Sequence, residues 1–312
     1  MMRYFPEGML LDSYENKRYQ RSEEMLMLAR EKGKILENIV VMCDANHDLW
    51  IDFGFIKGVI RRIDGACGIE DGSTRDIALI TRVNKPVCFT VGKIVSAEDG
   101  ERIVELSRKD VQLDCMKNYI RRLCPGDIIP ARVSHLESFG AFVDIGCGIA
   151  SLIPIDLISV SRISHPKDRF TVGSYIKAVV RQVDENGRVS LSHKELLGTW
   201  EQNAGRFSAG ETVSGIVRSV ESYGIFVELA PNLAGLAELK EGISAGQTVS
   251  VFIKTIIPER MKIKLIIIDS CETEQPPSAM KYFIDDGHIS YWRFSPEGSV
   301  RLIESRFDGS QA

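Results

Sequence analysis

The sequence contains no run of about 18 consecutive apolar residues, the length that a membrane-spanning helix requires. Its beginning, Met1 to Pro6, also lacks the long apolar core of a secretion signal. We therefore expect a cytoplasmic protein that makes no contact with a membrane.

Cysteine motifs are missing as well. The seven cysteines are scattered over the 312 residues, and no two of them stand in a Cys-x-x-Cys motif. An odd, scattered set of this kind encodes neither a disulfide framework nor a zinc ribbon. We expect reduced thiols that fill the core, with no bound metal and no cofactor.

Catalytic motifs and an excess of positive charge are also absent. There is neither a Gly-x-x-x-x-Gly-Lys-[Ser/Thr] loop nor a His-Glu-x-x-His motif, so we expect a binding protein and not an enzyme. Lys and Arg total 39 against 43 Asp and Glu, a net charge of -4. This balance argues against a protein that coats nucleic acid through bulk charge, and any such binding must come from local sites.

What the sequence does contain is a repeat. Residues 125–146 recur without a gap as residues 209–230, and a fainter copy lies upstream, where His47 to Gly54 stands opposite Phe139 to Gly146. A repeat of this length indicates a series of similar domains. We therefore predict three copies.

Each copy has short alternating segments separated by turns, which predicts a small antiparallel barrel. The second copy shows this best, with a tight turn at Asp184 to Gly187 and a longer connection over 155–173 that carries a short helix. Five strands with that connection describe the oligonucleotide/oligosaccharide-binding (OB) fold. The expected strands of the second copy are 127–135, 140–146, 149–153, 174–183 and 187–192.

The predicted fold class is therefore all-β, with three tandem five-stranded OB-fold barrels. Helical periodicity at 13–32, 111–122 and 192–207 predicts an N-terminal helix and two helical linkers. A three-stranded meander is expected at the C-terminus. The predicted segments are 1–32 (helical), 33–112 (first, degenerate barrel), 113–124 (linker), 125–193 (second barrel), 194–208 (linker), 209–269 (third barrel) and 270–312 (link and meander).

The second copy resembles an S1 RNA-binding domain, the repeat named after the largest protein of the bacterial small ribosomal subunit. The resemblance rests on Ser138 to Asp144 (Ser-Phe-Gly-Ala-Phe-Val-Asp), Ser164-His165-Pro166 and Val183 to Ser192. The order of the copies, the linker at Trp200 and the tail Tyr291 to Pro296 further resemble short bacterial homologues of that ribosomal protein.

This resemblance implies binding of single-stranded RNA on the barrel face built by strands two and three. Phe139, Phe142, Asp184 and Arg188 occupy the family's binding positions, whereas Pro154 replaces a histidine that usually follows strand three. The implied partners are messenger RNA and the small ribosomal subunit, and we expect a monomer.

Alternation of side chains gives a separate argument, because residues two apart share one face of a strand. Ala141, Val143 and Ile145 form an apolar row, which places Phe142 and Asp144 together on the solvent face. Strict alternation would turn Phe139 inward, and we expect a bulge or bend at Gly140 to return it outward.

The third copy repeats this pattern, with Ile225, Val227 and Leu229 predicted inward and Phe226 and Glu228 outward. The first copy keeps the inward row but has no glycine after His47. We therefore expect RNA binding to be strongest at the second copy, and protein docking is the alternative role of the first.

Aromatic side chains are expected to stack on bases, and cations to neutralise phosphates. For Asp184 three roles stay open: accepting from a base edge, holding Arg188, or capping the turn. The predicted RNA-binding residues are Phe139, Phe142, Asp184, Arg188, His165, Tyr223, Phe226 and Lys262, with Arg132, Lys167, Arg218, His47 and Trp50 as weaker candidates.

Two functions thus remain in competition. In one, the protein presents RNA to the ribosome during translation; in the other, it is an RNA-binding regulator or turnover accessory that acts off the ribosome. A third hypothesis, a protein-docking scaffold, requires the aromatic faces to be covered.

Overall fold

The computed structural model describes residues 4–96, 100–185, 187–271 and 280–307. The chain divides into two compact units, one made of residues 1–123 and 144–150 and the other of residues 124–143 and 151–312. No helix in these described ranges has the length and apolar character that a membrane span demands.

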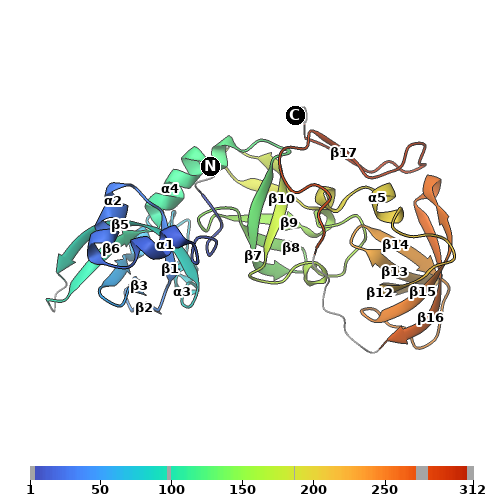
Figure 1. Ribbon diagram of the computed structural model, residues 1–312, viewed down its shortest axis with the longest axis horizontal. Helices are drawn as coiled ribbons and strands as arrows, with labels where there is room; N and C mark the ends of the chain where they lie inside the picture. Colours follow the sequence, from blue (N-terminus) through green and yellow to red (C-terminus); the bar gives the residue numbers. More distant parts are fainter. Residues whose placement is uncertain (1–3, 97–99, 186, 272–279, 308–312) are drawn as a thin grey trace. The chain divides into compact units, whose positions relative to one another are not determined.

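The N-terminal unit is a curled six-stranded sheet with the strand order β1-β5-β6-β4-β3-β2 (Figure 1). Its elements are α1 (Tyr14–Tyr19), α2 (Glu23–Glu31), β1 (Leu36–Ile39), β2 (Met42–Cys43), β3 (Leu49–Asp52), β4 (Lys57–Ile60), η1 (Arg62–Asp64), α3 (Ile77–Ile80), β5 (Pro86–Ser96), β6 (Arg102–Ser107), α4 (Lys109–Asn118) and η2 (Ile120–Arg122).

This sheet has six strands because the first strand expected for the barrel is divided into two, β1 and β2. Strand β1 pairs with β5 and strand β2 pairs with β3, so two consecutive pieces of chain form the two edges of the sheet. Between them, Val40 N–H donates to the Lys85 carbonyl and Val41 N–H donates to the Trp50 carbonyl. The OB-like strand order is thus kept, but the expected five-stranded first barrel is a curled sheet of six strands.

The helix predicted over 13–32 is two helices, because Ser22 begins a second one. The Ser22 hydroxyl accepts from the Met25 N–H, a standard N-cap that ends the continuity with α1. Leu26 and Ala29 of α2 are fully buried in the core of the N-terminal unit.

The C-terminal unit contains two closed five-stranded barrels, ordered β10-β11-β9-β8-β7 and β12-β13-β14-β16-β15. Each has the order first, second, third, fifth, fourth, as predicted for an OB fold. The elements are β7 (Ile128–Glu137), β8 (Gly140–Asp144), β9 (Ala150–Pro154), η3 (Ile155–Leu157), η4 (Pro166–Asp168), β10 (Tyr175–Val183), β11 (Val189–Ser192), η5 (Lys194–Leu197), α5 (Trp200–Ala204), β12 (Thr212–Glu221), β13 (Gly224–Ala230), β14 (Leu233–Ala237), β15 (Thr248–Ile257), η6 (Pro258–Arg260), β16 (Lys262–Cys271), β17 (Tyr291–Arg293) and β18 (Glu304–Arg306).

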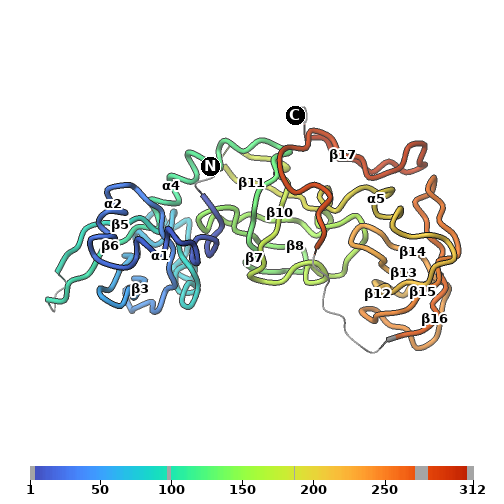
Figure 2. The backbone as a smooth tube through the Cα atoms, viewed as in Figure 1, coloured from blue at the N-terminus to red at the C-terminus, as the bar shows by residue number. Residues whose placement is uncertain are grey.

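The tail differs from the expected three-stranded meander. Among its described residues, 280–307, β17 pairs with β18 and residues 281–284 form no strand. Instead, the Phe283 N–H donates to the Leu196 carbonyl, and Trp292 and Phe294 join the core of the third barrel. Figure 2 shows the tail running beside α5, where the Trp200 N–H donates to the Phe294 carbonyl at 2.9 Å. Packing on the linker therefore replaces the third strand.

Candidate nucleic-acid interface

Strand β8 separates a core face from a face that carries aromatic rings. Ala141 and Val143 are fully buried, whereas Phe142 between them is half-buried on the opposite side. Phe139, in the turn before the strand, is 53% exposed. The Phe139 and Phe142 rings meet edge to face, with centroids 5.9 Å apart and planes at 88°. We call this pair the second-barrel platform.

The sequence suggested that Gly140 permits a bulge or bend, whereas in the structure its lack of a side chain meets a steric requirement. A Cβ at this position would lie 2.5 Å from the Ile153 carbonyl oxygen and 3.0 Å from a Leu152 methyl carbon. The glycine therefore permits close approach of β8 to β9. Phe139 lies in the turn that precedes β8, and its side chain reaches the surface there.

The third barrel repeats the arrangement. Ile225 and Val227 are fully buried, and Phe226 is half-buried on the other face. The exposed Tyr223 ring lies edge to face with Phe226, with centroids 6.1 Å apart and planes at 88°. We call this pair the third-barrel platform. Gly224 again allows close strand packing, since a Cβ there would lie 2.6 Å from the Ala237 carbonyl oxygen.

A third ring that the sequence argument missed lies beside the second-barrel platform. The His135 ring is 6.4 Å from Phe142, with planes at 31°, and its Nε2 lies 2.6 Å from Glu137 Oε1. Alternation along β7 would place His135 inside, with Ile129 and Val133. The alternation breaks after Val133, and both Ser134 and His135 are exposed.

Two predicted cations of the second barrel have local contacts, Arg132 through its side chain and Arg188 through its backbone. The Arg132 guanidinium lies 5.7 Å from the centroid of the Tyr175 ring, and Tyr175 is its register partner on β10. Arg188 is exposed, while its backbone N–H donates to Asp184 Oδ1 at 2.7 Å. Of the three roles left open for Asp184, this contact is the turn cap. Asn186, in the same turn, lies outside the described residues.

His165 and Lys167 belong to the connection between β9 and β10. His165 Nδ1 accepts from the Lys167 N–H at 3.1 Å, and Asp168 Oδ2 accepts from the His165 N–H at 3.3 Å. These reciprocal bonds begin η4 and orient the imidazole, and the Lys167 side chain is exposed.

Two carboxylates expected on the solvent face are buried. Glu228 is 6% exposed and accepts from Arg218 and Arg169, and the Arg218 Nη1 also lies 3.2 Å from Asp168 Oδ1. The guanidinium of Arg218 is therefore already paired with the carboxylates of Glu228 and Asp168. Leu229, expected in the core, is half-buried, because the strand register shifts between Glu228 and Ala230.

Asp144 is the second of these carboxylates, and it lies within the N-terminal unit. It accepts backbone N–H bonds from Glu7, Gly146 and Gly148 at 2.7, 2.8 and 3.0 Å. Burial, reinforced by the charge of Glu7, raises the pKa of the Asp144 carboxyl to about 7. Both carboxylates face away from their barrel cores as alternation predicts, but other segments cover them.

The first copy has no comparable platform. Trp50 Nε1 donates to Asp44 Oδ2 at 2.9 Å, and His47 Nδ1 lies 3.4 Å from Asp76 Oδ2. Within the described ranges, the His47 and Trp50 rings make no contact with each other. At the position of Gly140 stands Asp48, buried and bonded to the side chain of Arg61. This surface is therefore held together by hydrogen bonds and ion pairs.

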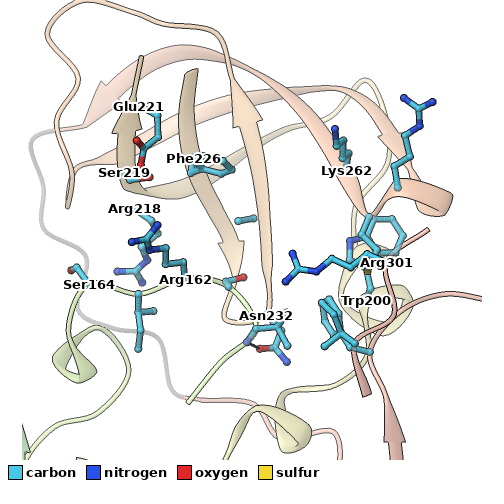
Figure 3. Close-up of a pocket in the computed structure, with 18 of the residues that line it drawn as sticks. Arg162, Ser164, Trp200, Arg218, Ser219, Glu221, Phe226, Asn232, Lys262 and Arg301 are labelled. Carbon is cyan, nitrogen blue, oxygen red and sulfur yellow. Dashed lines mark hydrogen bonds between the residues drawn. The ribbon is translucent and has the colours of Figure 1, made fainter. Parts of the chain in front are cut away.

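Four of the predicted residues of the third copy line one groove of about 1100 Å³ in the C-terminal unit. They are Tyr223, Phe226, Lys262 and Arg218, and Figure 3 shows the last three of them around the groove. Sequence reasoning could not find this groove, because part of its lining comes from the connection after β9, the linker and the tail, which are distant from the third barrel in the chain.

Comparison with known proteins gives the following matches. Residues 123–194 match the family model described as the S1 RNA binding domain. The small ribosomal subunit protein bS1 of Leuconostoc lactis is 32% identical over 248 residues, which cover 69% of this chain and 58% of that protein. The protein of the same name from Staphylococcus aureus (strain COL) is 29% identical over 215 residues, 62% of this chain and 55% of the relative.

This chain thus spans about half the length of the curated relatives it matches. Among solved structures, a multidomain protein with nucleic acid binding domains from Streptococcus pneumoniae aligns over 79% of this chain and 74% of that one. The sequence identity is 13% and the TM-score is 0.25.

Proposed function

This chain is a member of the S1 family, and we propose that it binds single-stranded RNA on the outward faces of its second and third barrels. The observation that carries the proposal is the recurrence of one ring geometry. Phe139 with Phe142, and Tyr223 with Phe226, meet edge to face at nearly the same separation on equivalent strands. Core packing gives no reason to repeat two partly exposed rings on the same face.

The chemistry of the two platforms suits unpaired bases. Every base has a π face, so an exposed ring can stack on it whatever its identity, at about 1–3 kcal/mol per base. An A-form duplex hides those faces within its own stack. Arg188 and Lys262, both exposed, supply charge for the phosphates.

The finer role that we propose is in translation. The relatives are named as proteins of the small ribosomal subunit, and we infer that this chain binds messenger RNA and associates with that subunit as a monomer. A role off the ribosome, as a regulator or turnover accessory, is the second candidate. Sedimentation with purified small ribosomal subunits distinguishes the role in translation from the role off the ribosome. The surface around Trp50, which is bonded internally, suits docking to another protein.

The test is the affinity for an oligouridylate of about 12 nucleotides, a length within the range that one OB fold binds, compared with its duplex with oligoadenylate. We expect tighter binding to the single strand. The Phe139→Ala/Phe142→Ala variant should lose this preference in part, whereas Tyr291→Ala, which removes an exposed ring elsewhere in the same unit, should not. Equal affinity of the intact chain for strand and duplex would reject the proposal.

A further inference from the structure

The groove beside the third-barrel platform is built by three segments of the C-terminal unit. One wall is the outward face of β12 to β14 with Phe226, the second is the connection 160–164 that follows β9, and the third is the tail around Phe294 and Arg301. Figure 3 shows Arg162, Lys262 and Arg301 arranged around one opening. We call this opening the composite groove.

The connection is fixed to the third barrel by a buried amide. Asn232, in the turn between β13 and β14, is 2% exposed, and its Oδ1 accepts from the Val160 N–H at 2.8 Å. Its Nδ2 donates to the carbonyls of Lys194 and Gly198 at 2.9 and 3.2 Å. These bonds set the position of the backbone that carries Arg162, two residues further along.

The tail is fixed in a similar way. The buried Ser295 hydroxyl donates to the Arg301 carbonyl at 2.7 Å and accepts from the Ile303 N–H at 2.8 Å, which closes the loop between them. The Val300 N–H donates to the Glu259 carbonyl of η6 at 3.3 Å. Arg301 is therefore held at the rim of the third barrel by contacts on both sides of its position.

The charge of the composite groove is strongly positive. Arg162, Arg260, Lys262 and Arg301 are exposed, and none of them forms an ion pair with another residue in the described ranges. Of the described residues that line the groove, only Glu221 carries a carboxylate. The four unpaired cations around the aromatic ring repel one another. A polyanion with groups that stack on the ring relieves this repulsion.

We propose that the composite groove holds the sugar–phosphate backbone of a single RNA strand whose base stacks on Phe226. This inference rests on the proposed function and extends it. Two segments outside the third barrel thereby become parts of its RNA site: the connection 160–164 of the second barrel, and the C-terminal tail. Arg162 and Arg301 contact phosphates on either side of the stacked base.

The test is fluorescence anisotropy with a labelled oligouridylate of about 12 nucleotides, using the full chain and its Arg162→Ala/Arg301→Ala variant. On a single strand, each phosphate contact adds about 0.7 to the magnitude of the slope of log K against log salt. Over the tenfold interval between 1 M and 0.1 M salt, one contact therefore contributes about 5-fold in affinity. We expect the double variant to bind about 25-fold more weakly. The salt slope should become shallower by about 1.4.

The matched control is Arg206→Ala/Lys254→Ala, which removes the same charge from exposed positions of the same unit outside the composite groove. It should change both quantities much less. An equal effect of the two double variants, or no effect of either, would overturn the proposal. Equal affinity of the intact chain for the single strand and for its duplex would instead reject the proposed function.

Discussion

Arg218 and Glu228 form a two-pronged ion pair in the C-terminal unit, with the arginine Nε and Nη2 each 2.9 Å from a different carboxylate oxygen. Arg169 donates to the same carboxylate, and the Glu228 and Arg169 side chains are almost fully buried. Two guanidinium groups thus share the Glu228 carboxylate, and Asp168 adds a second carboxylate beside Arg218. Glu228 lies on β13, the strand that carries Phe226, and Arg218 lies on the neighbouring strand β12, so the ion pair ties together the two strands beside the third-barrel platform.

Replacing Glu228 with Gln should lower the free energy of unfolding by about 3–5 kcal/mol, because two buried cations lose their shared partner. Urea denaturation measures this change. Glu238→Gln is the control, because Glu238 is exposed and forms no ion pair within the described ranges, and it should stay within about 0.5 kcal/mol of the parent. A loss of under about 1 kcal/mol in Glu228→Gln would show that water reaches the cluster.

Truncating Phe142 to Ala should weaken RNA binding by about 1–3 kcal/mol, the value of one stacked base. The sequence predicts a smaller loss for Phe226→Ala, but the four cations of the composite groove remove the reason for that difference, and we expect similar losses at both rings. Trp50→Ala should cost least. Thermal denaturation of each variant is the control, and unchanged affinity together with a sharp fall in Tm would show that the ring acts in packing.

The dependence of affinity on salt should be shallow, because the chain has a net charge of -4 and the cations that we propose to meet phosphates are confined to local sites. About two to four phosphate contacts on a single strand correspond to a slope of log K against log salt between about -1.4 and -2.8. Titration of a labelled oligouridylate at several potassium chloride concentrations measures the slope. A value steeper than about -5 would require a further basic surface.

His193 should make stability fall with acidity. Burial lowers its pKa to about 4 from the ordinary 6.5, and its Nδ1 lies 3.0 Å from the Ile158 carbonyl oxygen. Because the unfolded chain binds this proton more readily, stability from this group is full above about pH 6.5 and is lost as the pH falls towards 4. The loss approaches about 3 kcal/mol.

The measurement is the pH dependence of urea unfolding in the parent and in His193→Gln, since the difference isolates this side chain. Asp144 acts in the opposite direction, because a carboxyl whose pKa is raised to about 7 loses its contribution as the pH rises towards that value. Parallel profiles for parent and variant between about pH 4 and 6.5 would contradict the assignment to His193.

Local pattern was sufficient for the two closed barrels and for the direction of the Phe142 and Phe226 rings. Alternation along β8 and β13 places Phe142 and Phe226 opposite a buried apolar row, because successive side chains of a strand point to opposite faces. The recurrence of the same segment at Tyr223 identified the second ring pair. Both inferences need only residues that are neighbours in the chain.

What lies over a strand face depends on segments that are distant in the chain, and only the tertiary structure could decide it. Glu228 is buried because Arg169, carried by the connection of the preceding barrel, reaches it. Over residues 280–307 the tail has two strands and not the expected three, because Phe283 bonds to the linker at Leu196. Arg162 and Arg301 gather at one groove through Asn232 and Ser295, whose hydrogen bonds depend on packing between elements and leave no periodic trace in the sequence.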